Sequence, residues 1–340
     1  MSQLDLYLQR GPLSNPSASL TDIRRTVLQT GIPSAPDGTS DLRIYIWLLL
    51  LNAPPLRTDA YLDLVRQGAS PAYAKIRNDT FRTLTTDPLY RRKVTENALT
   101  RVLNAIAWKL HDANEARVNG WMSPPTLGVP KSLDGSEMWH SPASVSTRHT
   151  RGSVTGTEGS EAGDGGGSGS GVGYVQGMNV MAAPFMYTAR SEAEAFAGFD
   201  RFITAECPGY VRGSMGGVHK GLALVDRLLE LLDPELAAHM LAKGMKAEIY
   251  AFPSVLTMCA CTPPLTEVLL LWDFLFAYGP HLNLLCIVAQ LVMVRDQLLS
   301  SASPKPNFNP LRAKRVIEYT VDFARKVPND IYQEMITHAK

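Results

Sequence analysis

A glycine-rich run, GDGGGSGSGVGYVQGMN at residues 163–179, has the composition of a loop that cradles phosphate. A dinucleotide-binding loop needs Gly-x-Gly-x-x-Gly at the start of a helix, because its backbone must approach the pyrophosphate closely. No register of this run places glycine at the third position after a Gly-x-Gly pair, and the Gly-Lys dipeptide of a P-loop occurs nowhere in the chain. The glycines therefore predict no nucleotide site, and the residues that end the run, GYVQGMN, are the stronger candidates for function.

The histidines and cysteines indicate no other catalytic centre. The seven histidines form no His-Glu-x-x-His pair, and no Gly-x-Ser-x-Gly motif marks a hydrolase nucleophile. The cysteines lack the double-pair spacing of a zinc site and are interpreted as buried free thiols of a reducing compartment. These are Cys207, Cys259, Cys261 and Cys286. We therefore expect no metal and no cofactor of the chain's own.

Three short motifs follow one another along the chain. They are Arg43-x-x-x-Trp47, Ile76-x-x-Asp79-x-x-Arg82-Thr83 and Tyr174-x-Gln176-Gly177-Met178-Asn179. Alone, the second motif is typical of an exposed helix face with an ion pair between residues three apart, and the third of a helix start with a capping amide. The four-residue spacing of the first motif places Arg43 and Trp47 on one helical face, where we expect them to support the fold.

In this order the motifs resemble those of the TBC domain, a family of GTPase-activating proteins (GAPs) best known for acting on Rab GTPases. Downstream segments agree: LLELLDPELAAHML, Tyr-Ala-Phe at 250–252, and LWDFLFAYG with Trp272, Asp273 and Gly279. Pro253 and Ser254 depart from the general pattern, in which a tryptophan is common near this position. YVQGMNVMAAPFMY and the segment from 250 to 279 are most similar to the branch of fungal mitotic-exit and septation GAP subunits.

The resemblance implies that the chain supplies two side chains to the nucleotide site of another protein. An arginine would reach the phosphates and a glutamine would orient the attacking water, and the matching residues are Arg82 and Gln176. Arginine suits its role because the planar fork stays charged and bridges two oxygens. A glutamine amide both accepts from water and donates to a backbone, which glutamate cannot do. GTP and Mg²⁺ would belong to the partner, and the chain would turn over no substrate of its own.

Other motif residues are expected to support these two. Asp79 lies one turn before Arg82 and would orient its guanidinium if the helix continues through both, with a purely structural ion pair as the alternative. Gly177 would let the backbone turn close to the partner, and Asn179 would cap the helix that follows. Support is also expected from Tyr174 and Thr83, and structural roles from Ile76, Trp272 and Asp273.

The resemblance also implies partners and a place in the cell. The partners would be a small Ras- or Rab-like GTPase and the scaffold subunit of a two-component GAP that restrains mitotic exit and septation in the spindle checkpoint. The location would be cytoplasmic, at the spindle pole body or cytoskeleton. Two alternatives stay open: a catalytically silent adaptor that binds a scaffold or GTPase, and a Rab GAP in vesicle traffic.

The elements that must position these residues are predicted to be helices, in an all-α fold of two helical subdomains. Apolar residues recur at helical spacing without convincing strand alternation. The expected helical segments are 19–33, 70–84, 95–110, 216–232, 234–244, 266–279, 283–299 and 310–326. With 33 Lys and Arg against 32 Asp and Glu, no basic field suggests nucleic acid. No apolar stretch reaches the roughly 20 residues that span a bilayer.

One segment differs from the rest in composition. Residues 112–172 are rich in Ser, Thr, Gly and Pro and bury too little apolar surface to fold, so we expect a disordered insertion. Since the cost of closing a loop grows only with the logarithm of its length, both flanks can form one TBC domain over 36–330. The expected remainder is an N-terminal helical extension at 1–35 and a C-terminal tail at 331–340. Gln176 would then be positioned from the helix downstream of it.

Overall fold

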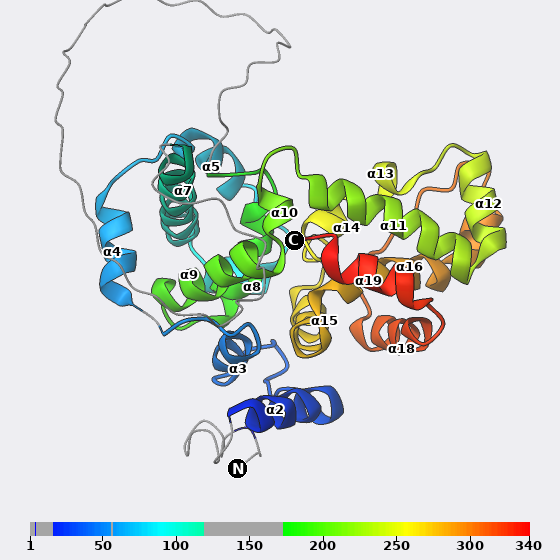
Figure 1. Cartoon of the computed structure of the whole chain (residues 1–340), viewed down its shortest axis with the longest axis horizontal. Helices are drawn as coiled ribbons and strands as arrows, with labels where there is room; N and C mark the ends of the chain where they lie inside the picture. Colours follow the sequence, from blue (N-terminus) through cyan, green and yellow to red (C-terminus); the bar gives the residue numbers. More distant parts are fainter. Residues whose placement is uncertain (1–3, 5–15, 56, 119–172) are drawn as a thin grey trace, which may run out of the picture. The chain divides into compact units, whose positions relative to one another are not determined.

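The computed structural model of the protein describes residues 4, 16–55, 57–118 and 173–340, and every regular element in these ranges is a helix (Figure 1). The all-α fold predicted from the sequence is confirmed. Met1–Asp112 and Gly171–Lys340 form one compact unit. Most of the predicted insertion lies outside the described residues. None of the described helices combines the length and the hydropathy needed to cross a membrane.

The N-terminal extension contains helix α2 (Pro16–Thr30), which packs along α15 (Leu265–Tyr278). Its buried face includes Ile23 and Val27, as the apolar spacing predicts. The helix ends before Gly31, whose φ of +73° is a conformation that glycine adopts easily. Residues 16–30 of the predicted extension are therefore helical, and they pack against α15.

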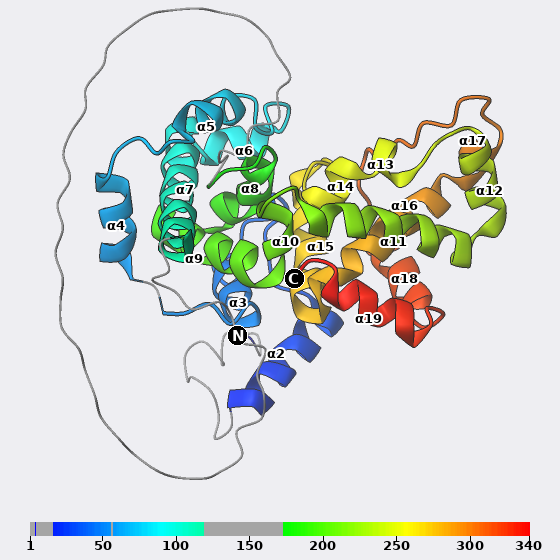
Figure 2. The ribbon, with the colours of Figure 1, turned by 45° about the horizontal axis from the view of Figure 1, so that its top comes forward.

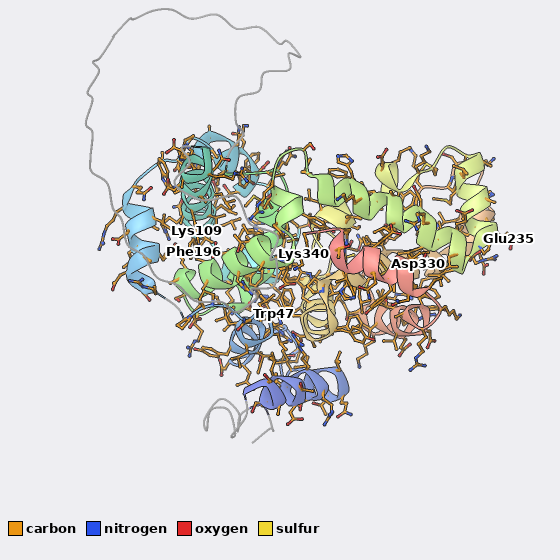
Figure 3. All side chains as sticks on the ribbon, in the orientation of Figure 1. Trp47, Lys109, Phe196, Glu235, Asp330 and Lys340 are labelled. Atoms are coloured by element: carbon orange, nitrogen blue, oxygen red, sulfur yellow. The ribbon has the colours of Figure 1, made fainter. Side chains whose placement is uncertain are left out.

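A first group of helices is arranged around α8 and α9 (Figure 1). Its members are α3 (Arg43–Leu50), α4 (Thr58–Arg66), α5 (Tyr73–Thr80), α6 (Pro88–Lys93), α7 (Glu96–Val118), α8 (Met178–Thr188) and α9 (Glu192–Arg201). The ammonium of Lys109 in α7 lies 2.6 Å from an Asp200 carboxylate oxygen and beside the ring of Phe196 (Figure 3). Helix α7 continues to Val118 and so overlaps the first residues of the insertion predicted from 112.

A second group of helices follows α9 and a π-helical turn, Phe202–Glu206. It contains α10 (Pro208–Val211), α11 (Gly216–Leu232), α12 (Pro234–Ala242), α13 (Ala247–Tyr250), α14 (Phe252–Leu256), α15, α16 (Asn283–Met293), α17 (Arg295–Leu299), α18 (Ala313–Ala324) and α19 (Asn329–Thr337). The long helix expected over 283–299 is thus divided at Val294. A 3₁₀ turn, Pro280–Leu282, precedes α16.

A cluster of buried aromatic rings joins the two groups. Its members are Trp47 from α3, Phe185 from α8, Phe202 from the π turn, and Trp272 and Phe276 from α15, and Trp47 is labelled in Figure 3. Neighbouring centroids lie 5.1 to 5.9 Å apart, in tilted, edge-on and stacked pairs of the kind that contribute beyond their buried area. Residues far apart in the sequence therefore share one core.

The end of the chain corrects another expectation. The residues predicted to form a tail continue α19, and Met335 and His338 are buried. The Tyr210 hydroxyl lies 2.8 Å from Nε2 of His338, and the backbone N–H of Gly209 donates to the carbonyl of Ala339 at 2.8 Å. These buried contacts hold the last residues against α10, which sequence periodicity over so short a segment does not reveal.

Candidate functional site

Arg82 lies in the turn after α5, where most of its side chain is open to solvent. Helix α5 ends at Thr80, so it does not continue through Arg82 as considered above. The backbone N–H of Arg82 instead donates to the carbonyl of Asp79 at 3.3 Å. The guanidinium binds the Asp79 carboxylate through Nη2, and the Arg82 side chain is 53% exposed against 7% for Asp79. Since fully buried Ile76 anchors α5, a fixed carboxylate holds an exposed cation.

Asp79 also binds the glutamine segment. The Tyr174 hydroxyl donates to Oδ2 of Asp79 at 2.9 Å. Burial raises the pKa of the Tyr174 hydroxyl, and the Asp79 charge adds to this rise, so the hydroxyl keeps its proton and donates. The Asp79 carboxylate therefore binds Arg82 through one oxygen and Tyr174, 95 positions further along the chain, through the other.

A second bridge joins the same two segments. Nδ2 of Asn179 donates to Oγ1 of Thr83 at 2.9 Å, and the Thr83 hydroxyl donates to the Asp79 carbonyl at 2.9 Å. Helix α8 begins at Met178, so Asn179 lies inside it and does not cap it as predicted. Its Oδ1 accepts instead from the backbone N–H of Gly177 at 3.2 Å. Buried Asn179 thus fixes the start of α8 against the turn that carries Arg82.

Gln176 is exposed in the turn immediately before α8. Its side-chain amide makes no hydrogen bond to any described residue, so both its donor and its acceptor face solvent. Arg82 and Gln176 are therefore brought to the same junction of α5 with α8, from elements that contact each other. The structure places together the two residues that the motifs singled out.

The glycines beside Gln176 serve the fold. Gly177 has a φ of +105°, and an added Cβ would lie 2.7 Å from Cδ2 of Leu256. Gly173 has a φ of +114°, and its Cβ would lie 2.6 Å from the Ala107 carbonyl oxygen on α7. The close approach at Gly177 is thus to a neighbouring helix of this chain, and its expected approach to a partner stays a prediction. The glutamine segment is also held on its upstream side, in addition to α8 downstream.

The first motif and the Trp-Asp pair form a separate, buried network. Arg43 binds Asp273 with Nε at 3.0 Å from Oδ1 and Nη2 at 3.2 Å from Oδ2, and the Trp47 indole N–H donates to Oδ1 at 2.8 Å. Nη1 of Arg43 donates to the carbonyl of Gly38. Trp272 donates to the carbonyl of Met258 at 2.9 Å. These groups touch one another inside the core, as expected for residues that support the fold.

The contact between Arg43 and Asp273, 230 residues apart, is one that sequence reasoning missed. A signal for it exists, because Asp273 interrupts the apolar run VLLLWDFLFAYG and Arg43 interrupts another, LRIYIWLLLL. A charge in a buried helix needs an opposite partner. Two lone and opposite charges in apolar helices could therefore have been paired.

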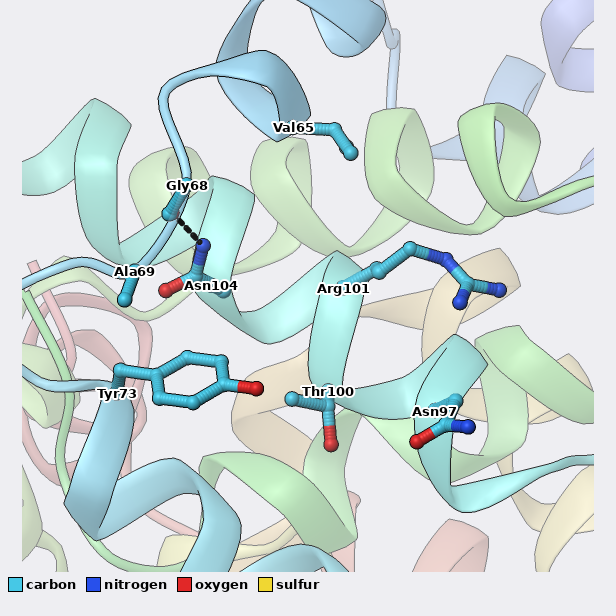
Figure 4. Close-up of a pocket in the computed structure, with 8 residues that line it drawn as sticks. All are labelled: Val65, Gly68, Ala69, Tyr73, Asn97, Thr100, Arg101 and Asn104. Carbon is cyan, nitrogen blue, oxygen red and sulfur yellow. Dashed lines mark hydrogen bonds between the residues drawn. The ribbon is translucent and has the colours of Figure 1, made fainter.

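A hollow of about 360 Å³ lies between the α4–α5 connection and α7 (Figure 4). Two of the polar side chains that line it bond within the fold. The Asn104 amide donates to the Gly68 carbonyl at 2.7 Å, and Nε of Arg101 donates to Glu192 at 2.9 Å. None of the motif residues lines this hollow, so it is separate from the candidate site.

Other expected sites can be checked only among the described residues. Within them, no three His, Cys, Asp or Glu side chains are arranged to hold a metal ion. The four cysteines are free, and three of them are buried as expected, whereas Cys261 is partly exposed.

The fold is that of known TBC domains. Solved structures with this fold include the Ypt/Rab-GAP domain of Gyp1p, with a TM-score of 0.63 at 15% identity, covering 95% of this chain and 96% of that one. The Chlamydomonas flagellar RabGAP TBC domain gives a TM-score of 0.56 at 18% identity and covers 98% of this chain and 88% of that one. At these identities the likeness concerns the fold.

Sequence comparison gives the family. A profile of the Rab-GTPase-TBC domain matches residues 170–299. The cell division control protein 16 of Schizosaccharomyces pombe is 38% identical over 96% of this chain and 90% of its own length. The mitotic check point protein BUB2 of Saccharomyces cerevisiae is 32% identical over 96% and 95%. The chain belongs to the TBC-domain family, and the resemblance drawn from the motifs is confirmed.

Proposed function

We propose that this protein is a GTPase-activating protein that inserts Arg82 and Gln176 into the nucleotide site of a small Ras- or Rab-like GTPase. One observation carries the proposal: an exposed arginine and an exposed glutamine, 94 positions apart, are held at one helix junction by buried polar contacts. A fold that needed neither side chain would have no reason to bring both residues to one junction while leaving their side chains in solvent.

The chemistry matches what GTP hydrolysis requires. In the transition state, negative charge is redistributed over the phosphate oxygens, and a positioned cation stabilises that charge. Asp79 occupies Nη2 of Arg82, so the other guanidinium donors are available for phosphate oxygens. The Gln176 amide can accept from the attacking water and donate to the partner. GTP and Mg²⁺ are the partner's, and this scheme gives the chain no cofactor.

Preorganisation is the contribution of the supporting residues. Tyr174 and Asp79 are buried before any partner binds, and Asn179 and Thr83 fix the two backbones relative to each other. Less conformational entropy is then lost when the two segments dock on the GTPase, because their backbones are already fixed.

We further propose that the protein acts in control of mitotic exit and septation, as the catalytic subunit of a two-component GAP with a scaffold. The names of two relatives, a cell division control protein and a mitotic check point protein, support this setting. The scaffold and a site of action at the spindle pole body are parts of this proposal.

Single-turnover GTP hydrolysis tests the proposal. A panel of GTPases that includes a mitotic-exit GTPase and several Rabs is incubated with the wild-type chain, Arg82→Ala and Gln176→Ala, with and without a candidate scaffold. Acceleration by the wild type and its loss in Arg82→Ala are expected, and the GTPase that responds identifies the substrate class. No acceleration by folded wild-type protein under any condition would favour the silent adaptor.

A further inference from the structure

We propose that exposed side chains of α5, of α6 and of the turn that carries Arg82 form a docking surface for an acidic region beside the nucleotide site of the partner GTPase. This surface, called the α5–α6 surface below, consists of Lys75, Phe81, Arg91 and Arg92. The proposal rests on the proposed function and adds which residues of this chain select the partner. It also states the chemistry that the partner must offer.

The charge of residues 73–93 is strongly asymmetric. This segment contains six cations and two carboxylates, Asp79 and Asp87. Both carboxylates are buried and used inside the fold. Asp79 holds the Arg82 guanidinium, and Asp87 caps α6 by accepting from two backbone N–H groups at 3.0 and 2.9 Å. Every exposed charge of this segment is therefore positive.

Two further cations of the segment are engaged within the chain. Arg77 lies 3.6 Å from a carboxylate oxygen of Glu96, and the ammonium of Lys93 lies over the Tyr187 ring at 5.0 Å. Three cations of residues 73–93, all within the described part of the chain, have no ion-pair partner: Lys75, Arg91 and Arg92. The negative end of the helix dipole stabilises cations, which would by itself explain two arginines in the C-terminal turn of α6. That effect does not explain Lys75, which lies in the first turn of α5.

Phe81 adds an apolar group to the same surface. Its side chain directly precedes Arg82, and the residue is 62% exposed. Exposed aromatic rings are frequent anchors of protein interfaces, where burial against a partner removes apolar area from water. Because Phe81 lies in the same turn as Arg82, it would lie close to a GTPase whose phosphates Arg82 reaches.

The position of the α5–α6 surface fits this partner. Helices α5 and α6 both contact α8, which begins two residues after Gln176 (Figure 2). Lys75 precedes Asp79 by four residues, so one face of α5 leads from Lys75 to the carboxylate that holds Arg82. Both helices that carry the cations therefore contact the helix that begins beside Gln176.

Charge complementarity then indicates which kind of GTPase would bind the α5–α6 surface. Unpaired cations attract a partner with acidic side chains beside its nucleotide, and they repel a partner that is basic there. Such long-range attraction raises association rates at low salt and weakens as ions screen it. The α5–α6 surface is thus a selector among GTPases that share the same nucleotide chemistry.

The test measures binding of the full chain to the same GTPase panel, loaded with a non-hydrolysable GTP analogue, at 0.05 and about 0.5 M salt. The variant Arg91→Glu/Arg92→Glu should bind the preferred GTPase about tenfold more weakly at low salt, with the difference largely lost at high salt.

Phe81→Ala should weaken binding about tenfold at both salt concentrations, because an apolar contact is not screened. Arg91→Gln/Arg92→Gln provides a milder variant in case glutamates disturb the end of α6.

A matched control reverses the same charge elsewhere. Lys314 and Arg315 are adjacent, exposed residues of α18, and Lys314→Glu/Arg315→Glu should bind like the wild type. Equal weakening by both charge reversals, or none by the α6 variants, would overturn the α5–α6 surface even if Arg82→Ala abolished hydrolysis. Conversely, salt-dependent weakening confined to α6, with no acceleration of hydrolysis by the wild type, would support the surface and reject the proposed function.

Discussion

The chain contains two arginine–aspartate pairs that differ in the exposure of the arginine. The side chains of Arg43 and Asp273 are 0% and 5% exposed, whereas those of Arg82 and Asp79 are 53% and 7% exposed. Both carboxylates are buried, and each therefore needs a hydrogen-bonded partner. Only one of the two arginines is buried with its carboxylate.

This difference separates a fold contact from a candidate catalytic one. Three nitrogens of Arg43 are bound inside the core, two by Asp273 and one by the Gly38 carbonyl, so this guanidinium has nothing left for a partner. Arg82 gives one nitrogen to Asp79, and the described residues accept no further hydrogen bond from its guanidinium. The same pair of residue types thus stabilises the core in one place and presents a cation to another protein in the other.

The largest effect is expected from Arg82→Ala. It should lower the accelerated hydrolysis rate by about 10³ to 10⁵, or about 4–7 kcal/mol in activation free energy. The free energy of unfolding should fall by about 1 kcal/mol or less, because the pair is half-exposed and Asp79 keeps the Tyr174 hydrogen bond. Single-turnover hydrolysis and urea unfolding measure the two effects. A stable variant with wild-type acceleration would remove Arg82 from the site.

Arg43→Ala should show the reverse pattern. It leaves the Asp273 carboxylate buried without its cation, which costs about 3–5 kcal/mol of unfolding free energy. Urea unfolding followed by circular dichroism measures this loss. A loss below about 1 kcal/mol would show that the buried pair is no more important to the fold than the exposed one.

Gln176→Ala tests the second exposed side chain. A group that positions the attacking water is expected to contribute about 10² in rate, somewhat less than Arg82. Since the Gln176 amide makes no hydrogen bond with any described residue, the melting temperature of the variant should not change. Hydrolysis and thermal unfolding of the same preparation check both expectations. A lowered melting temperature would indicate that Gln176 serves the fold.

Among the three variants at the candidate site, Tyr174→Phe should give the smallest effect on acceleration, and it tests the link between the two segments. Loss of the hydrogen bond to Asp79 should cost about 1.5–3 kcal/mol of stability. It should also reduce acceleration by about tenfold, a loss of about 1.4 kcal/mol, because Asp79 then holds Arg82 less rigidly. Tyr210→Phe is the control, since its hydroxyl contacts His338 away from the site. Equal loss of acceleration in both variants would point to general destabilisation.

Sequence periodicity predicted long helices well and short ones poorly. Helix α11 has the bounds expected from its apolar spacing, because a helix of 17 residues shows several repeats of that pattern. Helices α6, α10 and α13 have six residues or fewer, too few for a period to be seen. The end of α7 was missed because its last residues are polar and match the composition of the segment that follows.

The candidate site was predictable in its residue types and not in its connections. The motifs identified Arg82 and Gln176, and the structure brings them to one junction. The contacts that hold them depend on tertiary distances, as in Tyr174 to Asp79, which no local pattern encodes. The steric reason for Gly177 was likewise hidden, because Leu256 approaches from a distant helix.

The central claim is that the exposed arginine serves a partner. It is tested most directly by single-turnover hydrolysis with Arg82→Lys, in a protein shown to unfold at the wild-type temperature. Lysine keeps the charge beside Asp79 but lacks the planar fork that can bind Asp79 and phosphate oxygens together. We predict that the variant loses most of the acceleration while its stability is kept. Full acceleration by Arg82→Lys would contradict the account, since a point charge would then suffice where the structure holds a fork.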